Sequence, residues 1–155
     1  MKMQRLMMHL AGAAVVAASL PAYAQDANKA AAIELADKAA ANIQKKGVEE
    51  ACKDFADPKG GYIQGEVYVV VQDMQCKMVC HALNAKMNGK DMLELKDANG
   101  KHFTQDMRNV AMSGKPGWVD YVWPNPTSKV LEPKSAYVRK ADEKYMVSVG
   151  IYKQK

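Results

Sequence analysis

The chain has little arginine, serine and histidine, and these shortages exclude whole classes of protein. Only three of its 155 residues are arginine, and its basic residues are scattered lysines without the arginine-rich stripe of a nucleic-acid-binding surface. Beyond the N-terminal region only His81 and His102 remain as histidines, serines are few, and no recognisable pair of carboxylates occurs. The sequence therefore predicts neither a nucleic-acid-binding protein nor an enzyme.

Long hydrophobic runs are also absent, except for one at the N-terminus. A basic start is followed by the apolar run 6–20 and then by Pro21-Ala22-Tyr23-Ala24. This order predicts a secretory signal peptide, residues 1–24, cleaved after Ala24, and leaves one domain, residues 25–155, in the periplasm or outside the cell. The run is short for a membrane span, and an uncleaved anchor is the alternative. We expect no membrane span in the mature chain.

Cleavage would remove two of the 22 basic residues and lower the formal charge from +5 to +3. A mildly positive surface favours small anionic molecules as partners.

Three stretches have helical periodicity. Residues 26–46 are rich in alanine, lysine and glutamate, and their apolar residues recur every three or four positions, which predicts a long helix ended by Gly47. Residues 48–55 predict a short second helix with Cys52 on its inner face. The pattern of residues 103–112 predicts a third helix, which Gly114 ends.

Five runs of residues predict β-strands. Residues 67–72 are almost all β-branched and predict a central strand, with residues 78–82 returning beside it. After the long connection 84–100, which is long enough to indicate a functional loop, three aromatic and β-branched runs predict an antiparallel meander within residues 117–152. Alternation puts Trp118 on one face of the sheet and Tyr121 and Trp123 on the other, so at most one of these sets can line a pocket.

Three cysteines, Cys52, Cys76 and Cys80, lie in the mature chain. In an oxidising compartment one disulfide and one odd thiol are expected, with Cys52 joined to Cys80 or to Cys76, and free thiols are the other possibility. Cys76-Lys77-Met78-Val79-Cys80-His81 is one residue longer than the motif that attaches c-type haem. The alternative hypothesis is therefore a periplasmic haem c or redox protein that uses Cys76, Cys80 and His81.

Many short motifs, in one order and along nearly all of the mature chain, resemble the single Cache domain of the second type. They are Asp57-Pro58-Lys59-Gly60, Gly65-Glu66-Val67-Tyr68-Val69, Asp73, His81-Ala82, Asn84, Gly89-Lys90-Asp91, Leu95-Lys96-Asp97-Ala98-Asn99-Gly100-Lys101, Gly117-Trp118-Val119-Asp120-Tyr121, Trp123-Pro124-Asn125-Pro126, Pro133-Lys134-Ser135, Tyr137-Val138 and Gly150-Ile151-Tyr152.

The resemblance implies an α+β, PAS-like fold, in which a long N-terminal helix packs on a five-stranded antiparallel sheet and a ligand pocket lies on the sheet's other face. It implies a sensor module that binds small molecules, often carboxylates, without catalysis. Because no membrane helix or kinase follows Lys155, we expect a free-standing, exported version of the sensor module, with no cofactor and an unknown protein partner.

Aromatic side chains with one hydrogen-bond donor and a nearby cation would suit such a ligand. Lys134 is preferred to Arg139 as that cation because it lies in the family-like Pro-Lys-Ser triplet, and His81 is either a ligand contact or a structural residue. The ligand is expected between the meander and the 84–100 loop. The predicted ligand-binding residues are Tyr68, His81, Trp118, Tyr121, Lys134 and Tyr137.

Overall fold

The structure is a computed structural model that describes residues 20–153. Helices and strands follow one another in an order close to the expected one. The elements are α1 (Leu20–Lys46), α2 (Val48–Ala56), β1 (Ile63–Gln64), β2 (Val67–Asp73), β3 (Met78–His81), the 3₁₀ helix η1 (Ala85–Met87), α3 (Phe103–Met112), β4 (Gly117–Pro124), β5 (Leu131–Lys140) and β6 (Tyr145–Tyr152).

Helix α1 begins earlier than the sequence predicted, at Leu20 instead of Asp26. Pro21 lies in its first turn, where the missing N–H has no helical partner to lose, so the helix tolerates it there. Most of the predicted signal peptide lies outside the described residues, so the peptide and its cleavage after Ala24 stay predictions.

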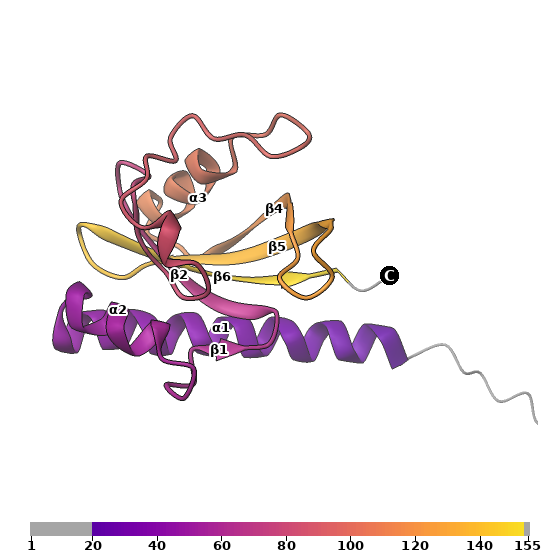
Figure 1. Cartoon of the computed structure of the whole chain (residues 1–155), viewed down its shortest axis with the longest axis horizontal. Helices are drawn as coiled ribbons and strands as arrows, with labels where there is room; N and C mark the ends of the chain where they lie inside the picture. Colours follow the sequence, from indigo (N-terminus) through magenta and orange to yellow (C-terminus); the bar gives the residue numbers. More distant parts are fainter. Residues whose placement is uncertain (1–19, 154–155) are drawn as a thin grey trace, which may run out of the picture.

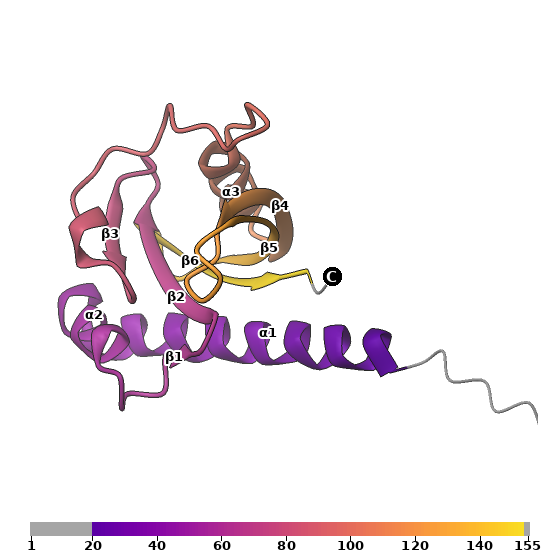
Figure 2. The same ribbon diagram turned by 45° about the vertical axis from the view of Figure 1, so that its right-hand side comes forward.

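One stripe of α1 is buried, and this stripe explains why the helix packs where it does. Leu35 and Ile43 lie two turns apart on the same side, with alanines between them that let the helix approach the sheet closely. Gly47 ends the helix with a φ of 82°, a positive value that glycine adopts without strain, and its N–H donates to the Ile43 carbonyl. The chain then turns into α2, which lies beside the end of α1 (Figure 2).

The sheet is antiparallel and follows the path β1-β2-β6-β5-β4, with β3 paired to β2. The last three strands form the meander that the sequence predicted, since β4 pairs with β5 and β5 pairs with β6. Strand β2 lies beside β6 in register Val69 to Val149, which places the first long strand next to the last. This arrangement confirms the expected α+β fold; the sequence had not indicated the two-residue β1 or η1.

The sheet lies between two layers, as Figure 1 shows: α1 on one face, and α3 with the long connection on the other. Strand alternation divides the core accordingly. Val69, Val147 and Val149 belong to the cluster beneath α1, whereas Val119 and Val138 pack against α3.

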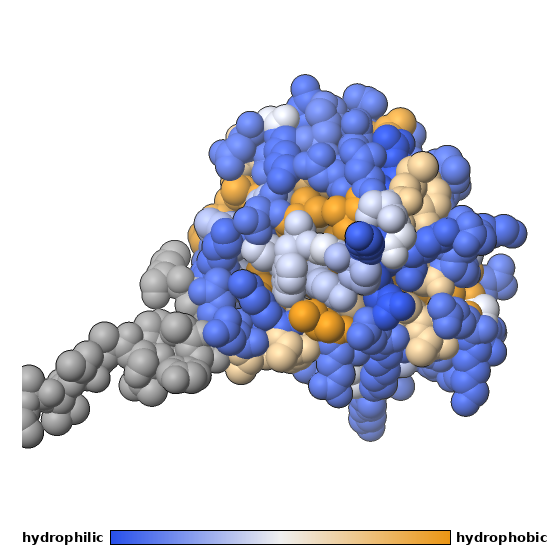
Figure 3. Space-filling model, turned by 180° about the vertical axis from the view of Figure 1, so that it is seen from behind, coloured by the Kyte–Doolittle hydropathy of each residue, from blue (hydrophilic) through white to orange (hydrophobic). Residues whose placement is uncertain are grey.

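No helix in the stretch 20–153 is long and apolar enough to cross a membrane. Seen from behind, in Figure 3, the surface is mostly hydrophilic, with apolar residues showing only in limited areas.

Candidate functional site

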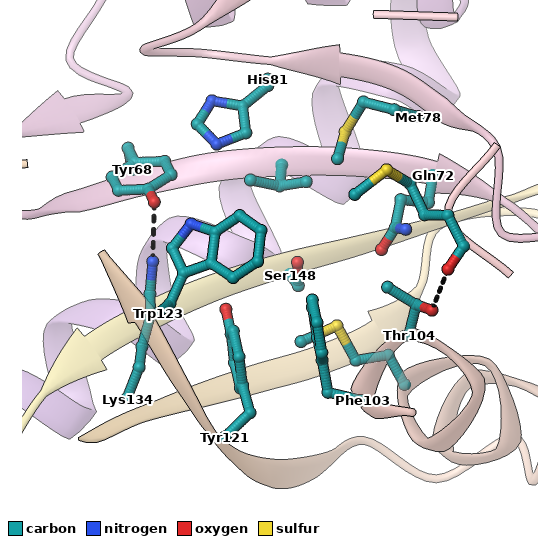
Figure 4. Close-up of a pocket in the computed structure, with 13 residues that line it drawn as sticks. Tyr68, Gln72, Met78, His81, Phe103, Thr104, Tyr121, Trp123, Lys134 and Ser148 are labelled. Atoms are coloured by element: carbon teal, nitrogen blue, oxygen red, sulfur yellow. Dashed lines mark hydrogen bonds between the residues drawn. The ribbon is translucent and has the colours of Figure 1, made fainter. Parts of the chain in front are cut away.

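A small cavity lies between the sheet and the layer that holds α3 (Figure 4). Its volume is about 30 Å³, room for roughly two water molecules. None of the described residues that line it is an aspartate or a glutamate. The lining residues are Tyr68, Val70, Gln72, Met78, His81, Met92, Phe103, Thr104, Met107, Tyr121, Trp123, Lys134 and Ser148.

Lys134 brings a cation into this cavity. Its side chain is only 3% exposed, and its ammonium donates a hydrogen bond to the Tyr68 hydroxyl at 2.8 Å. The same nitrogen lies 4.1 Å from the centre of the Tyr68 ring and 4.7 Å from that of Tyr152, so two aromatic faces hold it. Within residues 20–153, no carboxylate lies within ion-pair distance of Lys134.

Burial decides the charge state of Lys134. Removal from water lowers its pKa from the ordinary 10.5 to about 7, and the negative charge of Glu66 offsets this only partly. Near pH 7 the side chain is therefore charged in only about half of the molecules, and where it is charged it has no ion-pair partner within residues 20–153, so an anionic ligand would supply one and favour the ammonium form.

His81 lies beside this cation on β3. Its Nδ1 accepts a hydrogen bond of 3.1 Å from the Asn84 N–H, so the neutral ring carries its proton on Nε2 and can donate from there. Burial, together with the charge on Lys134, lowers its pKa from 6.5 to about 4. His81 is therefore uncharged at neutral pH, and of these two residues only Lys134 can carry a positive charge there.

Strand β4 and helix α3 contribute aromatic rings that form one wall of the cavity. The rings of Phe103 and Tyr121 are stacked with centres 4.4 Å apart, and Trp123 lies 5.3 Å from Phe103 at a tilt. Burial raises the pKa of the Tyr121 hydroxyl well above 10, so it stays a neutral hydrogen-bonding group. This wall gives the cavity an apolar side opposite its polar groups.

The long connection before α3 closes the cavity. Met92 is 4% exposed, and its carbonyl accepts a hydrogen bond from the Thr104 hydroxyl at 2.6 Å. Further along, one Asp97 oxygen accepts from the Val122 N–H at 3.0 Å and the other accepts from the Lys101 N–H at 2.9 Å, which ties the connection to the outer edge of β4. The expected position of the site, between the meander and this connection, agrees with where the cavity lies.

A disulfide joins Cys52 of α2 to Cys80 of β3, next to His81 in the chain. Cys76 is the free cysteine and is fully buried, with its thiol 3.5 Å from the Thr104 carbonyl. The haem alternative finds no support here, since the Cys80 sulfur is already bonded and Cys76 has no exposed surface.

Four of the six predicted ligand-binding residues meet at this cavity: Tyr68, His81, Tyr121 and Lys134. The other two, Trp118 and Tyr137, lie on the opposite face of the sheet against the α1 layer, with ring centres 5.3 Å apart. Their placement as cavity residues was wrong, because alternation along β4 and β5 turns them toward the helix.

Several lining residues were not among the predicted ligand-binding residues, among them Gln72, Phe103, Trp123 and Ser148. Alternation could have found Gln72, which is four residues after Tyr68 on the same strand face. Phe103 was predicted only as the first residue of the third helix, and nothing in the sequence indicated that this helix would cover the cavity.

Residues 21–154 match the family of single Cache domain 2. The chain belongs to this family. Members of the family are sensory modules that bind small molecules.

Known relatives of this Cache domain are chemotaxis receptors and their sensor domains. The methyl-accepting chemotaxis protein McpP of Pseudomonas putida is 28% identical over 72 residues, which make up 46% of this chain and 13% of that receptor. The chain therefore spans only a small part of the receptor's length.

Three solved structures share the Cache fold. A periplasmic sensor domain of a chemotaxis protein is 26% identical, with a TM-score of 0.68 over 88% of this chain and 100% of the other. A methyl-accepting chemotaxis protein from Vibrio parahaemolyticus is 20% identical, with a TM-score of 0.70 over 85% and 93%. A Cache chemosensory domain solved for its carboxylic acid recognition is also 20% identical, with a TM-score of 0.71 over 88% and 100%.

Proposed function

We propose that this Cache domain is an extracytoplasmic binding module for a small carboxylate, held in the cavity between the sheet and α3. The ligand is captured and released unchanged, and its presence is the signal. Among the relatives, one chemosensory domain is described for carboxylic acid recognition, and the cavity chemistry here suits the same class.

Lys134 carries this proposal. A buried ammonium without a carboxylate partner is costly, and a ligand carboxylate would relieve that cost by forming a charge-assisted hydrogen bond. The Tyr68 hydroxyl already contacts the ammonium, and His81 offers a neutral N–H nearby. These donors could share the two oxygens of one carboxylate.

The lining also argues against a cationic ligand. An amine or a zwitterionic amino acid would need an anionic partner for its ammonium, and the described lining residues supply none. The cavity volume of about 30 Å³ favours acids with few carbon atoms, and larger acids would require the methionine side chains to move.

Thermal unfolding with a panel of compounds tests the proposal. Short monocarboxylates such as acetate, propionate and butyrate are compared with matched uncharged amides and with the corresponding amines. We expect the melting temperature to rise with the acids alone, since a compound that binds only the folded state stabilises it. Equal shifts with the amides would contradict a role for the charge, and no shift with any acid would refute carboxylate binding.

A further inference from the structure

Gln72 is a buried polar residue in the cavity that the contacts described above leave unexplained. It is 3% exposed, and its Nε2 has no hydrogen-bond partner within the described part of the chain. Buried amide N–H groups nearly always have a partner, and leaving one without a partner costs stability. An unpaired donor in a cavity wall therefore points to something that occupies the cavity.

The strand geometry shows why this amide reaches the cavity. Gln72 follows Tyr68 and Val70 on the same face of β2, and all three line the cavity. Ser148 lies on the neighbouring strand, opposite Val70. In Figure 4 the Gln72 amide points from β2 into the space between the strand and α3.

This part of the cavity differs from the part around Lys134. Tyr68 and Gln72 are four residues apart, so their Cα atoms lie about 13 Å apart along an extended strand, while their side chains line one and the same small cavity. Met78 is paired with Gln72 across β2 and β3, Met92 and Met107 also line the cavity, and the Thr104 hydroxyl already donates to the Met92 carbonyl. The cavity thus has a cationic end and a neutral end with an amide donor.

We propose that Gln72 is a second ligand-binding residue, whose amide selects carboxylates that carry an oxo or hydroxyl oxygen on a carbon beyond the carboxylate. This inference rests on the proposed function and deepens it. The carboxylate pairs with Lys134, and the second oxygen accepts the hydrogen bond that the Gln72 Nε2 cannot make inside the protein. A plain fatty acid of the same length would leave that donor unpaired.

The test compares matched acids by titration calorimetry. Butyrate is paired with 3-hydroxybutyrate, and pentanoate with 4-oxopentanoate, on the wild-type chain and on Gln72→Met. Methionine keeps the length and shape of glutamine, resembles the neighbouring side chains and cannot donate.

In the wild-type chain we expect at least one oxygenated acid to bind roughly three- to tenfold more tightly than its plain partner, the effect of one hydrogen bond. In Gln72→Met that preference should disappear, while the plain acids keep or gain affinity. The unliganded variant should be at least as stable as the wild type, because it loses an unpaired buried donor.

The alternative outcomes separate the two proposals. If butyrate and pentanoate bind but neither oxygenated acid is preferred, or if Gln72→Met keeps the preference, the role of Gln72 is refuted and carboxylate binding stands. If Gln72→Met unfolds markedly more easily, the amide has a structural partner and the inference is overturned. If none of the four acids binds the wild-type chain, carboxylate binding fails, and the role of Gln72 fails with it.

Discussion

The buried position of Lys134 depends on the absence of a side chain at Gly150. Strand pairing sets Lys134 opposite Tyr152 and Ala136 opposite Gly150, so the lysine side chain passes over the glycine. A Cβ atom built at position 150 would lie 2.1 Å from the Lys134 Cε and 3.1 Å from both its Cδ and its Nζ. Gly150→Ala must therefore push the ammonium out of its place between Tyr68 and Tyr152, or shift the strand.

Overpacking of this kind costs about 1–3 kcal/mol of folding free energy. In a Lys134→Ala background the clashing atoms are gone, so the added methyl group should enter free space and Gly150→Ala should cost close to nothing. The two substitutions are therefore expected to couple by about 1–3 kcal/mol, the range seen for residues in direct contact.

Urea unfolding of the four proteins, followed by the fluorescence of Trp118 and Trp123, measures this coupling. Gly117→Ala is the matched control, since Gly117 is also a strand glycine and its added Cβ would meet only Val110, at 3.3 Å. The control should show no coupling to Lys134. Equal costs of Gly150→Ala with and without the lysine side chain would refute the packing argument.

Three further predictions concern pH, the disulfide and the free thiol. Because the pKa of Lys134 is about 7 in the folded chain and 10.5 ordinarily, both states hold the proton below pH 7, and between pH 7 and 10.5 the unfolded chain binds more protons. The free energy of unfolding that this residue contributes should therefore rise between pH 7 and 10.5, by at most a few kcal/mol. Chemical denaturation at several pH values should show this rise in the wild type and not in Lys134→Met. Removing the disulfide with the double substitution Cys52→Ser and Cys80→Ser should cost about 3.5 kcal/mol, given a sequence separation of 28; a loss below about 1 kcal/mol would contradict a structural bond. Thiol titration of the wild type should find Cys76 only after unfolding, since a reactive thiol in the folded chain would contradict its burial.

The secondary structure could largely be predicted because local patterns specify it. Apolar spacing and Gly47 defined the first two helices, and the β-branched and aromatic runs defined the meander. The start of α1 was missed because alanine-rich residues before Asp26 looked like the end of a signal peptide. The two-residue β1 is too short to leave a pattern.

The site was only partly predictable, because both faces of the sheet are covered. Alternation separated Trp118 from Tyr121 correctly, but apolar residues occur on both faces, so the pattern could not say which set faced α1 and which faced the cavity. Pairing of Cys52 with Cys80 depends on how α2 lies against β3, a contact between segments that the sequence does not relate. Gln72 is distinguished only by its missing partner, which needs coordinates to be seen.

Capture of a short carboxylate at Lys134 is tested most directly by titrating butyrate into three proteins at pH 6.5, below the pKa of the lysine. These are the wild type, Lys134→Met and Lys96→Met, the last removing an exposed lysine of the long connection as a control for charge. The account predicts one butyrate bound per chain in the wild type and in Lys96→Met, and at least tenfold weaker binding in Lys134→Met. Equal affinity in all three proteins would contradict it.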